Sequence, residues 1–118
     1  IGVTMFAPFL KNGINSTIED YVEAIAYIAN IAGVDQVGIG TDFTQGHDQA
    51  FFEWLTHDKG YARRLTNFGK IINPAGIRTV GEFPNLTEAL LKHGFSAEDV
   101  AKIMGGNWVR VLKEVWGE

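Results

Sequence analysis

The sequence has no cysteine, no basic stripe and no long uninterrupted apolar run. Without cysteine there can be no disulfide framework, no thiolate metal site and no thiol nucleophile, although the compartment is not fixed by this. The longest apolar stretches, such as residues 22–31, are interrupted by Glu23, Tyr27 and Asn30, so no membrane span is expected. The formal net charge of −4 comes from acidic and basic residues mixed along the chain, so we expect no nucleic-acid partner.

What is present is typical of one soluble domain with a hydrophobic core. The 118 residues are 46% hydrophobic and 20% charged. The chain opens directly on an apparent strand at Ile1, without a start methionine, so we expect it to be cut from a longer protein. A signal peptide therefore cannot be judged, and the compartment stays open, with the cytoplasm slightly favoured.

A strand–helix–strand unit is predicted for the N-terminal part. Residues 1–6 are typical of a strand, and Ser16 followed by Glu19 forms a capping-box pattern that should begin a helix. Apolar residues then recur at helical spacing until Gly33, which is expected to end the helix. Residues 36–40 form a short β-branched run that predicts a buried strand. Because such a crossover is right-handed, the two strands should be parallel neighbours.

Three helices are predicted for the C-terminal part. The first lies within residues 84–94, with the glycine at its end as the stop. Ser96 with Asp99 should cap the second helix. Asn107 is expected to cap a last helix that continues through Trp116.

Local motifs give little chemistry by themselves. His47, His57 and His93 are scattered without ligand spacing, so no complete zinc site is visible and each is interpreted as a surface or capping residue. The arginines at 63–64 could hold a carboxylate, but a solvated pair is the preferred interpretation. The chain has neither a dinucleotide fingerprint nor a nucleophile elbow.

Asp42 differs from the other polar residues because it directly follows the second, glycine-rich strand. In parallel α/β sheets and barrels, reactive groups collect at the C-terminal ends of the strands. If the two strands are parallel, Ala7 and Asp42 emerge at the same end of the sheet. Position alone leaves two readings open, a functional carboxylate and a simple turn cap.

Three sequence blocks carry a resemblance to a known family. Residues 33–43 read GVDQVGIGTDF, residues 83–91 read FPNLTEALL, and residues 94–111 read GFSAEDVAKIMGGNWVRV. These blocks resemble the signatures of the membrane dipeptidase family, the renal-dipeptidase-like metallopeptidases. In that family the first block runs G-[IV]-D-H-V-G-I-G-[ST]-D-F-D-G. Together with the opening strand the blocks span almost the whole chain, but they correspond only to the C-terminal part of the family.

The resemblance implies an α/β fold, the C-terminal part of a (β/α)8 TIM-like barrel. Residues 1–118 would supply the last two parallel strands and the C-terminal helices of that single domain. Family members hydrolyse dipeptides with two zinc ions, bound by a His-x-Asp pair, a bridging Glu and two later His. All these ligands are expected upstream of Ile1, so this chain should supply no metal ligand. The expected partners are a dipeptide or small amide substrate and the rest of the same barrel, with a homodimer as a further option.

The resemblance also implies roles for two residues. Asp42 would be catalytic and substrate-binding, because a carboxylate beside the metal-bridging water can take its proton and can hold the ammonium group of a dipeptide. Phe6 stands where many relatives have a tyrosine near the substrate. Lacking that hydroxyl, Phe6 would keep only an apolar role in the substrate pocket.

Two departures from the family pattern limit what can be transferred. Thr44 replaces the second acid of D-F-D-G, and residues 43–73 form an aromatic-rich insertion expected on the active-site face. Such a rebuilt rim could act as a lid or an oligomer contact, so the substrate is not fixed. A related metal-dependent amidohydrolase with a different small amide substrate, or a non-catalytic relic of the fold, remains an alternative. The 118-residue chain alone is expected to be inactive and to bind no zinc tightly.

Overall fold

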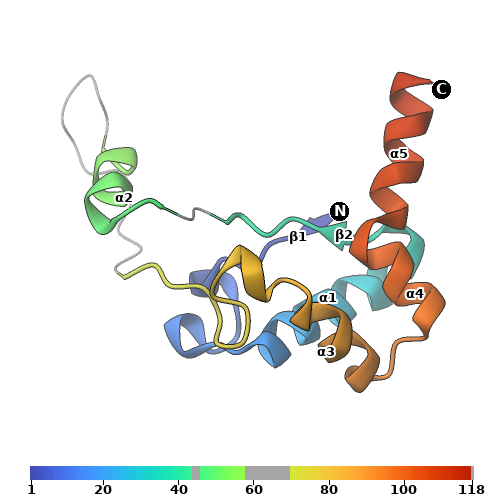
Figure 1. Cartoon of the computed structure of the whole chain (residues 1–118), viewed down its shortest axis with the longest axis horizontal. Helices are drawn as coiled ribbons and strands as arrows, with labels where there is room; N and C mark the ends of the chain where they lie inside the picture. Colours follow the sequence, from blue (N-terminus) through green and yellow to red (C-terminus); the bar gives the residue numbers. More distant parts are fainter. Residues whose placement is uncertain (44–45, 58–69, 118) are drawn as a thin grey trace.

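The computed structural model describes residues 1–43, 46–57 and 70–117. In these ranges a pair of short central strands lies among helices, with α5 standing at one end of the molecule and α2 near the other (Figure 1). Short 3-10 turns and one π-type turn, Lys102–Gly106, connect them. The strands and α-helices are β1 (Gly2–Val3), α1 (Ile18–Ala32), β2 (Gly38–Ile39), α2 (Gln49–Leu55), α3 (Asn85–His93), α4 (Ala97–Ala101) and α5 (Asn107–Trp116).

The two strands form a parallel pair, which confirms the prediction from the crossover pattern. Gly2 lies opposite Gly38, and Val3 lies opposite Ile39. The N–H of Gly40 donates to the carbonyl oxygen of Val3 at 3.0 Å. The α/β arrangement with parallel strands is therefore present. Closure into a barrel remains an expectation, because the described residues contain only this one strand pair.

The first helix begins one residue later than the sequence pattern indicated. Thr17, not Ser16, is the N-cap, and the carboxylate of Asp20 accepts the N–H of Thr17 at 2.8 Å to complete the capping box. The predicted pair of Ser16 and Glu19 was therefore wrong. The physical reason is a bridge to a distant segment, in which the carbonyl oxygen of Ser16 accepts the N–H of Ala75 at 2.9 Å. The pairing also keeps Thr17 extended, with φ −112° and ψ 174°, so the helix cannot begin before Ile18.

The core lies between the strand pair, α1 and α3. Tyr21 of α1 is fully buried, and its hydroxyl donates to the carbonyl oxygen of Val3 at 2.6 Å. Burial raises the pKa of Tyr21 above its usual value. The same carbonyl also accepts the N–H of Gly40, the residue directly after β2, so α1 and both strand segments meet at one backbone atom. The buried core cluster comprises Val3, Met5, Leu10, Ile18, Tyr21, Val22, Ile25, Val37, Ile77, Leu86, Leu90, Val100 and Ile103.

Two helix boundaries near the C-terminus match the sequence prediction. Gly94 ends α3 in the left-handed conformation, with φ 113° and ψ 8°. The Oγ of Ser96 accepts the N–H of Asp99 at 3.1 Å and caps α4. No helix in the described ranges combines the length and apolarity that a membrane crossing requires.

Asn107 does not cap the last helix, so that prediction was wrong. The backbone is already helical at Gly106 and Asn107, because α4, the π-type turn and α5 follow one another with only Gly105 outside helical angles. The side-chain amide of Asn107 instead donates to the carbonyl oxygens of Val34 at 2.8 Å and Val37 at 2.7 Å. Through these two hydrogen bonds, Asn107 connects the start of α5 to the segment before β2.

Candidate active site

Asp42 is exposed and lies just beyond the C-terminal end of β2. Its φ is 57°, and no other non-glycine residue in the described part of the chain has a positive φ. A side chain with a Cβ is strained in this left-handed region, although aspartate tolerates it better than most residues. Backbone strain of this kind collects at functional sites, where the surrounding structure must maintain it. The residue that the sequence pattern singled out thus has an uncommon backbone conformation, and its catalytic role stays a prediction.

The residues on both sides of Asp42 are anchored. The Oγ1 of Thr41 accepts the N–H of Phe43 at 3.4 Å and spans the strained position. The ring of Phe43 is partly buried against the hydrophobic core. These two contacts fix the backbone on either side of Asp42, while its side chain is exposed at the end of the sheet.

Phe6 lies at the same end of the sheet as Asp42. Each of the two residues stands three positions beyond a paired strand residue, Val3 for Phe6 and Ile39 for Asp42. Because the strands are parallel and in this register, both residues leave the sheet at its C-terminal edge. Phe6 is half-buried, and its ring meets that of Phe9 edge to face with centroids 5.0 Å apart. The structure thus brings the two predicted site residues to one end of the sheet.

The glycines before Asp42 have a packing role that the sequence analysis missed. The indole Nε1 of Trp108 donates to the carbonyl oxygen of Ile39 at 3.0 Å. A Cβ added at Gly38 would come within 2.5 Å of that nitrogen, and one added at Gly40 would come within 3.1 Å of the backbone of Gly2. Glycine is therefore required for β2 to lie against both the indole and β1. The glycine spacing was visible in the sequence, but the partner, far along the chain, was not.

The three histidines lie apart, each in local contacts. The ring of His47 stacks on Phe51 with centroids 3.9 Å apart. The Nδ1 of His57 lies 2.5 Å from the carbonyl oxygen of Glu53. Because a carbonyl oxygen can only accept, Nδ1 is the donor in this hydrogen bond. His93 is exposed at the end of α3. These placements fit the interpretation of surface and helix-end residues.

The described residues do not assemble a metal centre. In ranges 1–43, 46–57 and 70–117, no three or more histidine, aspartate or glutamate side chains gather as they would around a metal ion. Zinc is usually held by three or four such ligands. The donor set of the described residues therefore does not fit a resident zinc ion. Arg63, Arg64 and Thr44 lie outside the described residues.

The described part of the predicted insertion contributes a small pocket of about 220 Å³. His47 and Phe52 line it together with Asn73 and Arg78. The guanidinium of Arg78 donates to the carbonyl oxygen of Asn73 at 2.8 Å, and the amide of Asn73 donates back to the carbonyl oxygen of Arg78 at 2.9 Å. In the described part of the predicted insertion, Trp54 of α2 is 59% exposed.

Comparisons with known proteins assign this chain to a family. A family model described as membrane dipeptidase (peptidase family M19) matches residues 1–68 and 65–116. Dipeptidase tcpJ of Claviceps purpurea is 31% identical over 112 residues, which are 93% of this chain and 21% of that protein. Dipeptidase ataJ of Aspergillus terreus is 34% identical over 101 residues, which are 86% of this chain and 19% of that protein.

The chain also matches a solved structure. The crystal structure of an amidohydrolase from Pseudomonas aeruginosa is 76% identical and superposes with a TM-score of 0.94, covering 99% of this chain and 36% of that one. The chain therefore spans about a fifth of the length of the curated relatives it matches, and just over a third of the solved one. The family match extends over nearly the whole chain, which confirms the resemblance seen in the sequence blocks. This chain belongs to the membrane dipeptidase family.

Proposed function

We propose that the full-length protein is a zinc-dependent dipeptidase to which this chain supplies the carboxylate of Asp42. The observation that carries the proposal is the position of Asp42, exposed and held at φ 57° just beyond the C-terminal end of a parallel strand. Relatives that are named dipeptidases support the hydrolase class. The match to a solved amidohydrolase supports a barrel of which β1 and β2 would be the last two strands.

A carboxylate at this place suits the hydrolysis of a dipeptide. It can accept the proton of an attacking water molecule, and it can pair with the ammonium group of the substrate. Two zinc ions, bound by residues outside this chain, would supply the activation of the water. Phe6, at the same sheet end, would contribute an apolar wall to the pocket. In (β/α)8 barrels the catalytic residues stand at this C-terminal face, which agrees with the placement of both residues.

A second candidate function is the hydrolysis of a different small amide. The observation that favours it is the pocket of about 220 Å³ that is lined by His47, within the predicted insertion, and by Arg78 just beyond it. The solved relative at 76% identity is described as an amidohydrolase rather than as a dipeptidase. A changed rim can alter which substrate is admitted without changing the chemistry at Asp42.

The test is an assay of the purified full-length protein on three substrate sets: L,L-dipeptides, L,D-dipeptides and small amides without a free ammonium group. Dipeptide hydrolysis that stops on chelation and returns with zinc is the expected result. Turnover of the third set only would favour the second candidate. No turnover of any set by zinc-loaded protein would contradict both and favour a non-catalytic relic.

A further inference from the structure

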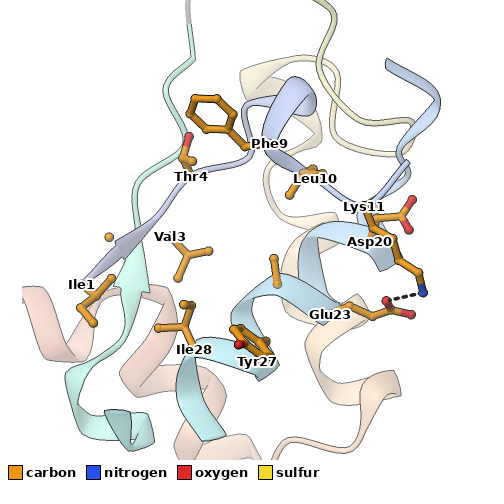
Figure 2. Close-up of a pocket in the computed structure, with 12 residues that line it drawn as sticks. Ile1, Val3, Thr4, Phe9, Leu10, Lys11, Asp20, Glu23, Tyr27 and Ile28 are labelled. Atoms are coloured by element: carbon orange, nitrogen blue, oxygen red, sulfur yellow. Dashed lines mark hydrogen bonds and ion pairs between the residues drawn. The ribbon is translucent and has the colours of Figure 1, made fainter. Parts of the chain in front are cut away.

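Two hollows in the described part of the chain differ in their chemistry. The groove of about 540 Å³ beside β1 is lined mainly by apolar side chains, and the ammonium of Lys11 on its rim lies 3.1 Å from the carboxylate of Glu23 (Figure 2). These two charges neutralise each other. The pocket of about 220 Å³ that His47, Phe52 and Arg78 help to line, here called the Arg78 pocket, has no acidic side chain among its described lining residues. Of the two hollows, the Arg78 pocket is therefore the one suited to an anion.

Neutral partners hold the guanidinium of Arg78 in place. Its Nη1 donates to the carbonyl oxygen of Asn73 at 2.8 Å. Glu82, the nearest acidic residue along the chain, is engaged elsewhere, because its Oε2 accepts the backbone N–H of Arg78 at 2.7 Å and that of Thr79 at 3.1 Å. Within the described ranges, Arg78 forms no ion pair. A guanidinium has several N–H donors in a planar fork, so most of those of Arg78 remain for a ligand.

The other lining residues of the Arg78 pocket fit a carboxylate on a short apolar stem. The ring of His47 is held by its stacking on Phe51, with centroids 3.9 Å apart. A histidine ring carries an N–H donor in each of its neutral tautomers. Phe52 and Ile72 supply apolar surface for methylene groups. A volume of about 220 Å³ is below the usual size of a pocket for a whole small molecule, so this pocket has room for one group of a larger ligand.

The Arg78 pocket lies within reach of a substrate at Asp42. Gly46, which lines the pocket, follows Asp42 by four positions, so their Cα atoms are at most about 14 Å apart. Figure 1 shows the chain running from β2 to α2, away from the strand pair. An extended dipeptide spans about 7 Å, and a long side chain on its second residue extends further. A dipeptide whose ammonium group pairs with Asp42 can therefore bring an acidic side chain to the pocket.

We propose that the Arg78 pocket binds the side-chain carboxylate of the second residue of the substrate, so that the full-length enzyme prefers dipeptides ending in glutamate or aspartate. This inference rests on the proposed dipeptidase activity. Arg78 and His47 donate to the carboxylate, and hydrogen bonds from a guanidinium to a carboxylate are among the stronger ones in proteins. Asp42 holds the ammonium group at the other end. A side-chain amide of the same shape lacks the negative charge and is bound less well.

The experiment compares Ala-Glu with Ala-Gln as substrates of the zinc-loaded full-length protein, each with an L- and a D-configured second residue. We expect kcat/KM to be at least about tenfold higher for Ala-Glu, the scale of one charge-assisted hydrogen bond. Arg78→Met should abolish this preference by raising KM for Ala-Glu while leaving Ala-Gln unchanged. Arg110→Met is the matched control, at an arginine of α5 that does not line the pocket, and it should keep the preference.

A merely structural role of Arg78 predicts a different result. If Arg78 only holds the loop through Asn73, Arg78→Met should lower kcat/KM equally for both substrates, and this outcome would overturn the proposal. A wild-type protein that hydrolyses both dipeptides equally well would overturn it too.

A second measurement needs no turnover. Calorimetry on the metal-free full-length protein should show Ala-Glu binding at least about tenfold more tightly than Ala-Gln to the wild type, and equally to Arg78→Met. Such discrimination in binding, without hydrolysis of either dipeptide by the zinc-loaded protein, would support the pocket and contradict the proposed dipeptidase function. Hydrolysis of both dipeptides without discrimination in either measurement would support that function and refute the pocket.

Discussion

The decisive perturbation is a series of three substitutions at Asp42 in the full-length protein. Asp42→Asn keeps the size and one acceptor oxygen of the side chain but removes its negative charge. The variant can then neither take the proton of water nor pair with a substrate ammonium group, so turnover should fall at least about a hundredfold. Asp42→Gly and Asp42→Ala remove the whole carboxyl group and should be at least as inactive.

The same series separates chemistry from backbone strain. A residue with a Cβ at φ 57° is strained by about 1–2 kcal/mol, less for aspartate and asparagine, while glycine is not strained there. Glycine in turn loses about 0.5–1 kcal/mol more conformational entropy on folding. Asp42→Asn and Asp42→Gly should therefore stay within about 1 kcal/mol of the wild type in free energy of unfolding. Asp42→Ala should be about 1–2 kcal/mol less stable, because alanine tolerates the left-handed region less well than aspartate does.

Turnover, bound zinc and urea unfolding should be measured on the same purified samples. Near-normal turnover in Asp42→Asn would refute the catalytic role, because asparagine replaces aspartate well in a turn. Loss of zinc together with activity would make Asp42 a metal ligand and would refute its role as a proton acceptor. Equal stability of the glycine and alanine variants would refute the strain argument.

Three further substitutions test the packing that positions the strand end. Gly38→Ala puts a Cβ within 2.5 Å of the Trp108 indole and should lower the free energy of unfolding by about 1–3 kcal/mol in urea. Asn107→Ala removes two hydrogen bonds, one of them to the buried carbonyl of Val37, so thermal unfolding should show a loss of about 1–3 kcal/mol. Tyr21→Phe removes a donor to Val3 and should cost about 1 kcal/mol near neutral pH. Because burial raises the folded-state pKa of Tyr21, its stabilisation is complete below the ordinary value of 10.0 and declines at higher pH, a decline that Tyr21→Phe should lack in urea titrations.

Local sequence patterns predicted the elements well where the deciding contacts are local. The helical spacing of α1, the left-handed Gly94 and the cap formed by Ser96 depend on residues within a few positions of each other, and all are present. The failures occurred where a distant segment decides. Two adjacent pairs satisfy the capping-box pattern, and only the bridge to Ala75 selects Thr17 over the residue before it.

The candidate site shows the same division. Asp42 was identified from its place after a strand and from the family motif, and parallel pairing then put it at the same end as Phe6. Its positive φ could not be predicted, because no glycine or turn dipeptide marks the position. The contact of Trp108 with β2 was also invisible, because it joins segments far apart in the sequence.

The strain at Asp42 argues that this strand end is built to hold a carboxylate rather than merely to turn. A turn needing φ 57° is most easily made with glycine, which other turns of this chain use at positive φ. Here an aspartate is kept in that conformation by contacts on both sides. The hydrogen bond between Thr41 and Phe43 spans the turn, and the indole of Trp108 fixes the strand before it. Because these contacts hold the backbone whatever the side chain at position 42, they position a carboxylate at the open end of the sheet, where a substrate ammonium group or an attacking water could reach it.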